Sequence, residues 1–109
     1  MIVRVSEAHV RDGLADEFLA LLRELVASFP EQYDGLLRHD VLVDLVDPSR
    51  VQYVSEWADE AALVAYAGSE WRTQPVTFPD EERFLRQPLA LRHFISSMPV
   101  IAQDLRIRR

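Results

Sequence analysis

Apolar and polar residues alternate along residues 2–10, which read Ile-Val-Arg-Val-Ser-Glu-Ala-His-Val. This alternation is typical of a β-strand, because successive side chains of a strand point to opposite faces of its sheet. The side chains of one face are those of Ile2, Arg4, Ser6, Ala8 and Val10. The Asp12-Gly13 pair that follows predicts the end of the strand.

Residues 14–29 show the clearest helical pattern of the chain. Their apolar side chains recur every three or four positions and would form one stripe along a helix: Leu14, Phe18, Leu22, Leu25 and Phe29. Asp12 is the expected N-cap, and acidic residues in the first turn suit the positive end of the helix dipole. Pro30 is expected to end the helix, because proline has no backbone N–H to donate.

A hairpin is expected over residues 36–57. Residues 36–46 alternate between an acidic side and an apolar side that includes His39. Residues 47–50, Asp-Pro-Ser-Arg, suit a type I turn with aspartate at its first position and proline at its second. Residues 51–57 then continue as the partner strand.

The rest of the chain predicts one more helix and one more strand. Asp59 is a suitable N-cap for a helix over residues 60–67, and Gly68 is suited to end it. Residues 69–88 contain three prolines and show no clear period, and residues 89–97 are expected to form the last strand. The order β-α-β-β-α-β predicts an α+β, ferredoxin-like fold with a four-stranded antiparallel sheet.

Both helices of such a fold cover the same face of the sheet, so the other face is left bare. Its apolar side chains need cover, and a second copy of the chain is the simplest source. We therefore expect a homodimer. We expect one domain over residues 1–97 and a C-terminal extension, residues 98–109, that docks on the protein surface.

Composition excludes several classes of function. The net charge is −6, whereas nucleic acids and anionic membranes are bound by basic surfaces. The chain has no cysteine for a disulfide or a thiolate, no lysine for a Schiff base, and no asparagine. The first residues do not follow a signal-peptide pattern and no apolar run is long enough to span a membrane, so we expect a cytoplasmic protein.

Several segments resemble the antibiotic biosynthesis monooxygenase family over about residues 1–97. They are Asp34-Gly35-Leu36-Leu37, the turn at residues 47–50, and residues 53–63, where a strand ending in Trp57 runs into a helix. One group of short members is also similar at Trp71-Arg72-Thr73-Gln74-Pro75-Val76 and at His93-Phe94.

The resemblance implies a dimeric α+β barrel in which two sheets pack face to face. It also implies a pocket between each sheet and its own helices. Some members oxygenate anthrones and related aromatic compounds without metal or flavin, through a carbanion that reacts with O2. Others degrade haem, act on quinols or handle small signalling molecules. We accordingly expect no cofactor, and a small aromatic or apolar molecule as the partner of the pocket.

The resemblance also disfavours one of these activities. Haem-degrading members use an asparagine in the first strand, a tryptophan in the second helix and a histidine soon after it. Ser6, Tyr66 and Pro75 stand at or near those positions here. Anthrone-oxygenating members also use asparagine and tryptophan in the pocket, although the Tyr66 hydroxyl can hydrogen-bond a phenolic substrate.

The candidate catalytic residues are histidines, because a cofactor-free oxygenase needs a base that works near neutral pH. His93 is the first candidate because it belongs to the matching pattern, and His39 is the second. The alternative for each is a structural histidine. The three histidines with Glu7 could also bind a metal, but no local ligand spacing supports this, so no metal site is predicted.

The predicted substrate-binding residues are Ser6, Tyr66, Trp71, Arg72 and Phe78. The aromatic members of this set could line a pocket, or else anchor the long loop on the sheet. Arg72 could pair with a substrate oxygen, or with Glu70 or Asp59 at the surface.

Two functions follow from these patterns. The first is a cofactor-independent monooxygenase acting on a small aromatic or enolisable compound. The second is a non-catalytic homodimer that binds a small ligand. A histidine opening onto an enclosed cavity beside Tyr66 would favour the enzyme.

Overall fold

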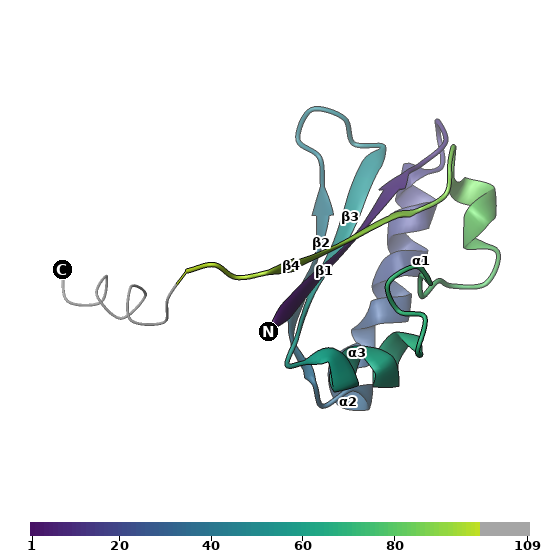
Figure 1. The fold of residues 1–109 in the computed structure, drawn as a ribbon. Helices are drawn as coiled ribbons and strands as arrows, with labels where there is room; N and C mark the ends of the chain where they lie inside the picture. Colours follow the sequence, from purple (N-terminus) through teal and green to yellow (C-terminus); the bar gives the residue numbers. More distant parts are fainter. Residues whose placement is uncertain (99–109) are drawn as a thin grey trace.

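A computed structural model describes residues 1–98 of the chain, in which helices cover one face of a four-stranded antiparallel sheet (Figure 1). The elements follow in the order β1 (Ile2–His9), α1 (Ala15–Ala27), α2 (Phe29–Gln32), β2 (Leu36–Val43), β3 (Arg50–Trp57), α3 (Glu60–Ala67), the 3-10 helix η1 (Glu81–Phe84) and β4 (Ala90–Ile95). The predicted α+β, ferredoxin-like fold is confirmed. The extension expected to dock lies almost wholly outside the described residues.

The strands are arranged in the order β2-β3-β1-β4. β1 pairs antiparallel with both β3 and β4, and Arg4 lies opposite Ser55 on one side and His93 on the other. Because paired residues project to the same face, this register places side chains from three strands together under the helices.

The first helix differs from its prediction at both ends. α1 begins after Leu14, whereas Asp12, the expected N-cap, is hydrogen-bonded to Arg86. α1 ends at Ala27, and Pro30 does not end it but lies in the first turn of the short α2. Proline is tolerated there because the first N–H groups of a helix have no partner within the helix.

The boundaries of α3 agree with the prediction. The Asp59 side chain accepts a hydrogen bond of 2.9 Å from the backbone N–H of Ala62, as an N-cap does. Gly68 ends the helix with φ of +88°, a conformation that strains any residue with a Cβ.

The turn before β2 packs closely on α3. A Cβ built on Gly35 would lie 2.3 Å from the Cβ of Ala62, and the N–H of Ala58 donates to the Gly35 carbonyl at 2.9 Å. The φ of Gly35 is not in the left-handed region, so glycine is needed here for space and not for the turn.

Residues 69–88 form a long loop held down by buried side chains. Trp71, Phe78 and Phe84 are each at most 5% exposed, and Phe78 and Phe84 pack with Phe18 of α1. An isolated antiparallel bridge joins Leu85 to Val10 at the end of β1. The loop therefore forms part of the hydrophobic core, although its sequence shows no period.

The face of the sheet away from the helices is partly apolar. Val3, Val5 and Val54 lie there half-buried, with the more exposed Leu42 and Phe94 beside them. Within residues 1–98 no helix is long and apolar enough to cross a membrane.

Candidate functional site

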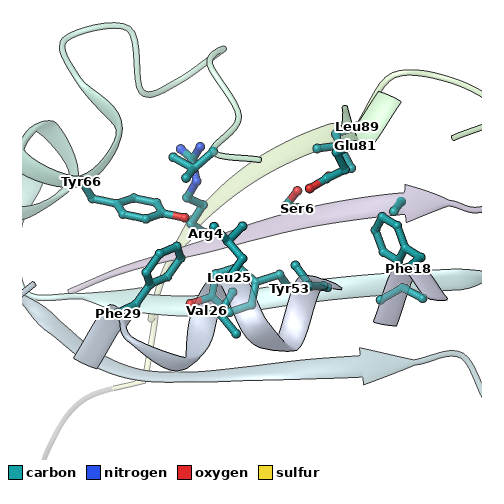
Figure 2. A pocket seen from close by; sticks show the side chains of 14 residues that line it. Arg4, Ser6, Phe18, Leu25, Val26, Phe29, Tyr53, Tyr66, Glu81 and Leu89 are labelled. Carbon is teal, nitrogen blue, oxygen red and sulfur yellow. The ribbon is translucent and has the colours of Figure 1, made fainter. Parts of the chain in front are cut away.

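A cavity lies between the sheet and the segments that cover it (Figure 2). The enclosed space is small, with a volume of about 20 Å³. This is room for about one water molecule, so a larger ligand needs the side chains of the wall to move apart. Leucine, valine, alanine and phenylalanine side chains make up most of its wall. The polar side chains on the wall are those of Arg4, Ser6, Tyr53, Tyr66 and Glu81.

Arg4 is a buried cation on the cavity wall, only 3% exposed. Its Nη1 atom donates to the carbonyl of Trp71 at 2.6 Å, and its Nη2 atom donates to the carbonyl of Gln74 at 2.7 Å. No carboxylate within residues 1–98 forms an ion pair with it. Its positive charge is therefore satisfied by neutral groups, and it can attract an anionic oxygen in the cavity.

His93 supports Arg4 from the neighbouring strand. Its Nε2 atom lies 3.1 Å from Nη1 of Arg4, and because a guanidinium only donates, Nε2 is the acceptor. Burial, followed by the charges of Arg4 and Arg72, lowers the pKa of His93. The ring is thus held neutral with its proton on Nδ1, and it packs edge-on against Trp71 with 4.8 Å between centroids.

Tyr66 reaches the cavity from α3 beside Arg4. Its ring stacks on Trp57 at 4.4 Å, and the guanidinium carbon of Arg4 lies 5.7 Å from its centroid. Burial raises the pKa of Tyr66, so the phenol stays protonated and can donate a hydrogen bond.

Tyr53 links the cavity to His39. Its hydroxyl lies 2.7 Å from Nδ1 of His39, which occupies a shallow hollow between β2 and α1 outside the cavity. Burial raises the pKa of Tyr53, so its hydroxyl stays protonated in this bond.

Glu81 is the buried acid of the cavity. It begins η1, is 3% exposed, and its Oε1 atom accepts a hydrogen bond of 3.2 Å from the N–H of Phe78. Burial raises the pKa of Glu81 to about 7, and the negative charge of Glu82 adds to this effect. A group with this pKa exchanges protons readily at neutral pH.

The structure brings some of the predicted site residues together and separates others. Ser6 and Tyr66 line the cavity. His93 and Trp71 do not line the cavity but bind Arg4, which does. The His93 ring and the Trp71 carbonyl both accept hydrogen bonds from the Arg4 guanidinium.

The other predicted residues lie away from the cavity wall. Phe78 packs in the core between Phe18 and Phe84. Arg72 is exposed, lies over the Trp71 ring and pairs with Glu60 at 3.3 Å, so its partner is neither Glu70 nor Asp59.

Sequence reasoning missed three of the polar cavity residues, Arg4, Tyr53 and Glu81. Arg4 had a signal, because it is the one charged residue on the otherwise mostly apolar face of the first strand. Glu81 had none, because it stands in the charged run Asp-Glu-Glu-Arg at residues 80–83, where only the backbone decides which side chain turns inward.

The sequence and the fold were compared with known proteins. The model of the antibiotic biosynthesis monooxygenase family matches residues 1–74. The chain belongs to this family. Its matched part contains the whole β1-α1-α2-β2-β3-α3 unit, with Arg4, Ser6, Tyr53 and Tyr66, and ends before Glu81 and β4.

Several solved structures share this fold. A crystal structure of an antibiotic biosynthesis monooxygenase is 28% identical, with 91% of this chain and all of that chain covered and a TM-score of 0.70. A candidate monooxygenase of this kind from Nitrosomonas europaea is 17% identical, with 90% of this chain and all of that chain covered and a TM-score of 0.71. A conserved protein from Methanosarcina mazei Go1 is 21% identical, with 85% of this chain and 89% of that chain covered and a TM-score of 0.69. No curated protein gives a significant match.

The three histidines are not grouped as metal ligands in the part of the chain that the structure describes. Within residues 1–98, no three histidine, aspartate or glutamate side chains are grouped as metal ligands would be. His9 instead pairs with Glu7 at 3.1 Å on the outer face of the sheet.

Proposed function

We propose that the chain is a cofactor-independent monooxygenase that acts on a small aromatic or enolisable compound in the cavity. The observation that carries the proposal is the Arg4 guanidinium beside the protonated Tyr66 hydroxyl. The guanidinium is buried on the cavity wall and, within residues 1–98, is hydrogen-bonded to neutral partners only. A cation and a phenol donor together stabilise the enolate oxygen that forms when a carbon acid loses its proton. Membership of the family supports the same class of reaction.

The proposed reaction converts an activated CH2 group into a carbonyl, with O2 as oxidant. A base removes one C–H proton, and the carbanion adds to O2 to give a peroxide that takes up a proton. Loss of the second C–H proton then forms the C=O bond, breaks the O–O bond and releases water. One oxygen atom ends in the product and the other in water, so the substrate loses two hydrogens and gains one oxygen.

Two histidines remain candidates for the base. Neither lines the cavity, and each contacts one side chain that does. His93 acts through Arg4, whose donor occupies its Nε2 atom, and His39 acts through the Tyr53 hydroxyl. This arrangement favours positioning roles for both rings. His93 would hold the guanidinium in place, and His39 would orient the phenol.

The proposed assembly is a homodimer formed by the outer sheet face. The half-buried Val3, Val5 and Val54 and the exposed Phe94 and Leu42 would be covered by the same face of a second copy. The cavity lies on the opposite side of the sheet, so each subunit would keep its own site.

The test of catalysis is oxygen uptake with a panel of anthrones and quinols, corrected for oxidation without protein. Tyr66→Phe removes the donor beside Arg4 and keeps the ring, and we expect the rate to fall by about 10- to 100-fold. Tyr33→Phe is the matched control, because Tyr33 packs edge-on against Tyr66 but does not line the cavity. Equal losses in the two variants, or uptake at background for the wild type, would contradict the proposal.

A non-catalytic ligand-binding function is the second candidate. It is favoured by one observation, that the cavity wall is mostly apolar and no histidine is part of it. In that case anthrones would raise the melting temperature of the protein without any oxygen uptake.

A further inference from the structure

We propose that Glu81 is the general base that takes the proton from the substrate carbon. This inference rests on the function proposed above. It replaces a histidine in that role by a residue that neither the sequence pattern nor the family model points to.

The position of Glu81 fits a base for a bound molecule. Its side chain is on the cavity wall, and Figure 2 shows it beside Ser6, whereas Arg4 and Tyr66 lie farther along β1. Ser6 and Arg4 are two residues apart on the same face of β1, a spacing of about 7 Å in a strand. A ring system that spans this distance would place an oxygen near Arg4 and an acidic carbon near Glu81, and the side chains of the cavity wall must move apart to admit it.

The hydrogen bonding of Glu81 leaves it able to accept a proton. Its hydrogen bond from the N–H of Phe78 is made at Oε1 alone. Within the described part of the chain, Glu81 pairs with no arginine or histidine side chain. A carboxylate fixed by one backbone donor and not neutralised by a cation is oriented and remains basic.

The backbone turns Glu81 inward at a local conformational cost. Asp80, directly before it, has φ of 60° and is the one non-glycine residue with positive φ in residues 1–98. After this turn Glu81 is buried, whereas Glu82 and Arg83 are exposed, and Arg83 pairs with Glu17 of α1. Phe84 and Phe78, both in the core, hold η1 in place on either side of the acid.

The surroundings keep the carboxyl poised near neutral pH. The groups that face it are Tyr66 from α3 and Glu82 from η1, with Arg4 and Tyr53 on the wall from β1 and β3. Burial raises the pKa of Glu81 to about 7, so at neutral pH a large fraction of the acid is ionised and is a stronger base than an exposed carboxylate.

In the proposed step, the Glu81 carboxylate removes a C–H proton and becomes a carboxylic acid. The electron pair of that bond passes to the substrate, whose enolate oxygen is held by Arg4 and Tyr66. After O2 adds to the carbon, the acid returns the proton to the peroxide. Glu81 is then ionised again and can remove the second C–H proton as water is lost.

The experiment separates proton removal from oxygenation. Anthrone is incubated with the protein in D2O without oxygen, and exchange of its CH2 protons is followed by NMR above the protein-free rate. We expect Glu81→Gln to lose the protein-dependent exchange by 100-fold or more, the range of general-base catalysis. Glu24→Gln, an exposed acid on α1, should stay within about 2-fold of the wild type, and wild-type exchange should rise with pH through about 7. Circular dichroism and binding of anthraquinone check that Glu81→Gln is folded and still binds.

The outcomes distinguish the two proposals. If Glu81→Gln exchanges protons as fast as the wild type, the Glu81 assignment is overturned. Oxygen uptake that persists in that variant would leave the proposed function standing. If the wild type exchanges protons but consumes no oxygen under air, the base is supported and the oxygenase is refuted. If the wild type binds anthrone without exchange, the base assignment is overturned too, and a parallel His93→Gln measurement shows whether the histidine is the base instead.

Discussion

The Nη1 atom of Arg4 lies 2.6 Å from the carbonyl oxygen of Trp71, 67 positions away in the sequence. This bond joins the first strand to the loop that follows α3, and the bond to the Gln74 carbonyl repeats the connection. One buried side chain thus closes one end of the cavity and also presents its charge to it. The same residue is therefore important for both stability and ligand binding.

Replacing Arg4 by methionine should destabilise the fold by about 2–4 kcal/mol, because two carbonyls lose a charged donor and one of the bonds is buried. The free energy of unfolding in urea measures this loss. Arg72→Met is the matched control, since Arg72 is exposed and pairs with an exposed Glu60, and it should cost less than about 1 kcal/mol. Similar losses in both variants would show that the Arg4 bonds contribute little.

Replacing Gly35 by alanine should destabilise the protein by about 1–3 kcal/mol, because the new Cβ would overlap that of Ala62. Combining it with Ala62→Gly removes the overlap. The double variant should then be more stable than the sum of the two single losses predicts, as a double-mutant cycle in urea measures. Simple additivity would mean that the turn and α3 are not in close contact in solution.

The contribution of Glu81 to the stability of the wild type should fall as pH rises from about 4.5 to 7, whereas the lowered pKa of His93 acts in the opposite direction. In this window the unfolded Glu81 ionises at its ordinary pKa of 4.5, while the folded carboxyl, with a pKa of about 7, still holds its proton. The folded state therefore binds more protons, and the loss attributable to Glu81 approaches about 3 kcal/mol above pH 7.

Glu81→Gln should remove the Glu81 contribution to the pH dependence, and Glu24→Gln, an exposed acid on α1, should retain it. Urea unfolding of the three proteins at several values between pH 4.5 and 8 measures the slopes. The same slope in Glu81→Gln as in the wild type would show that the Glu81 carboxyl titrates in the folded protein as it does in water.

The outer sheet face should mediate dimerisation. Val54→Glu places a charge at its centre opposite Val5 and should convert a dimer into a monomer, as light scattering measures. Val64→Glu is the control, because Val64 is an exposed valine on α3. A wild-type monomer at micromolar concentration, or a dimer unaffected by Val54→Glu, would contradict the proposed assembly.

The order of the strands and main helices could be predicted because apolar residues recur in them with a clear period. The alternation of residues 2–10 indicates a strand, and the apolar stripe from Leu14 to Phe29 indicates a helix. Local cues were less decisive at the ends of α1. Asp12 binds Arg86 instead of capping the helix, and Pro30 begins a further short helix, because contacts distant in sequence compete with local preference.

The candidate site was less predictable than the fold. Ser6 and Tyr66 lie on regular elements, and the resemblance to the family placed both at pocket positions. Arg4 and Glu81 depend on contacts that no period encodes, namely the carbonyls of the long loop and the positive φ of Asp80. Aromatic residues of that loop suggested a pocket, but the side chains of Trp71 and Phe78 serve to anchor the loop in the core.

The central claim, cofactor-free oxygenation in the cavity, is tested most directly by oxygen uptake with anthrone. Metal-free wild-type protein should consume one O2 for each anthraquinone formed, well above the rate without protein. Arg4→Gln should abolish this excess, whereas Arg72→Gln should retain it. Uptake at the background rate in a folded wild-type protein that binds anthrone would contradict the claim and identify the cavity as a binding site only.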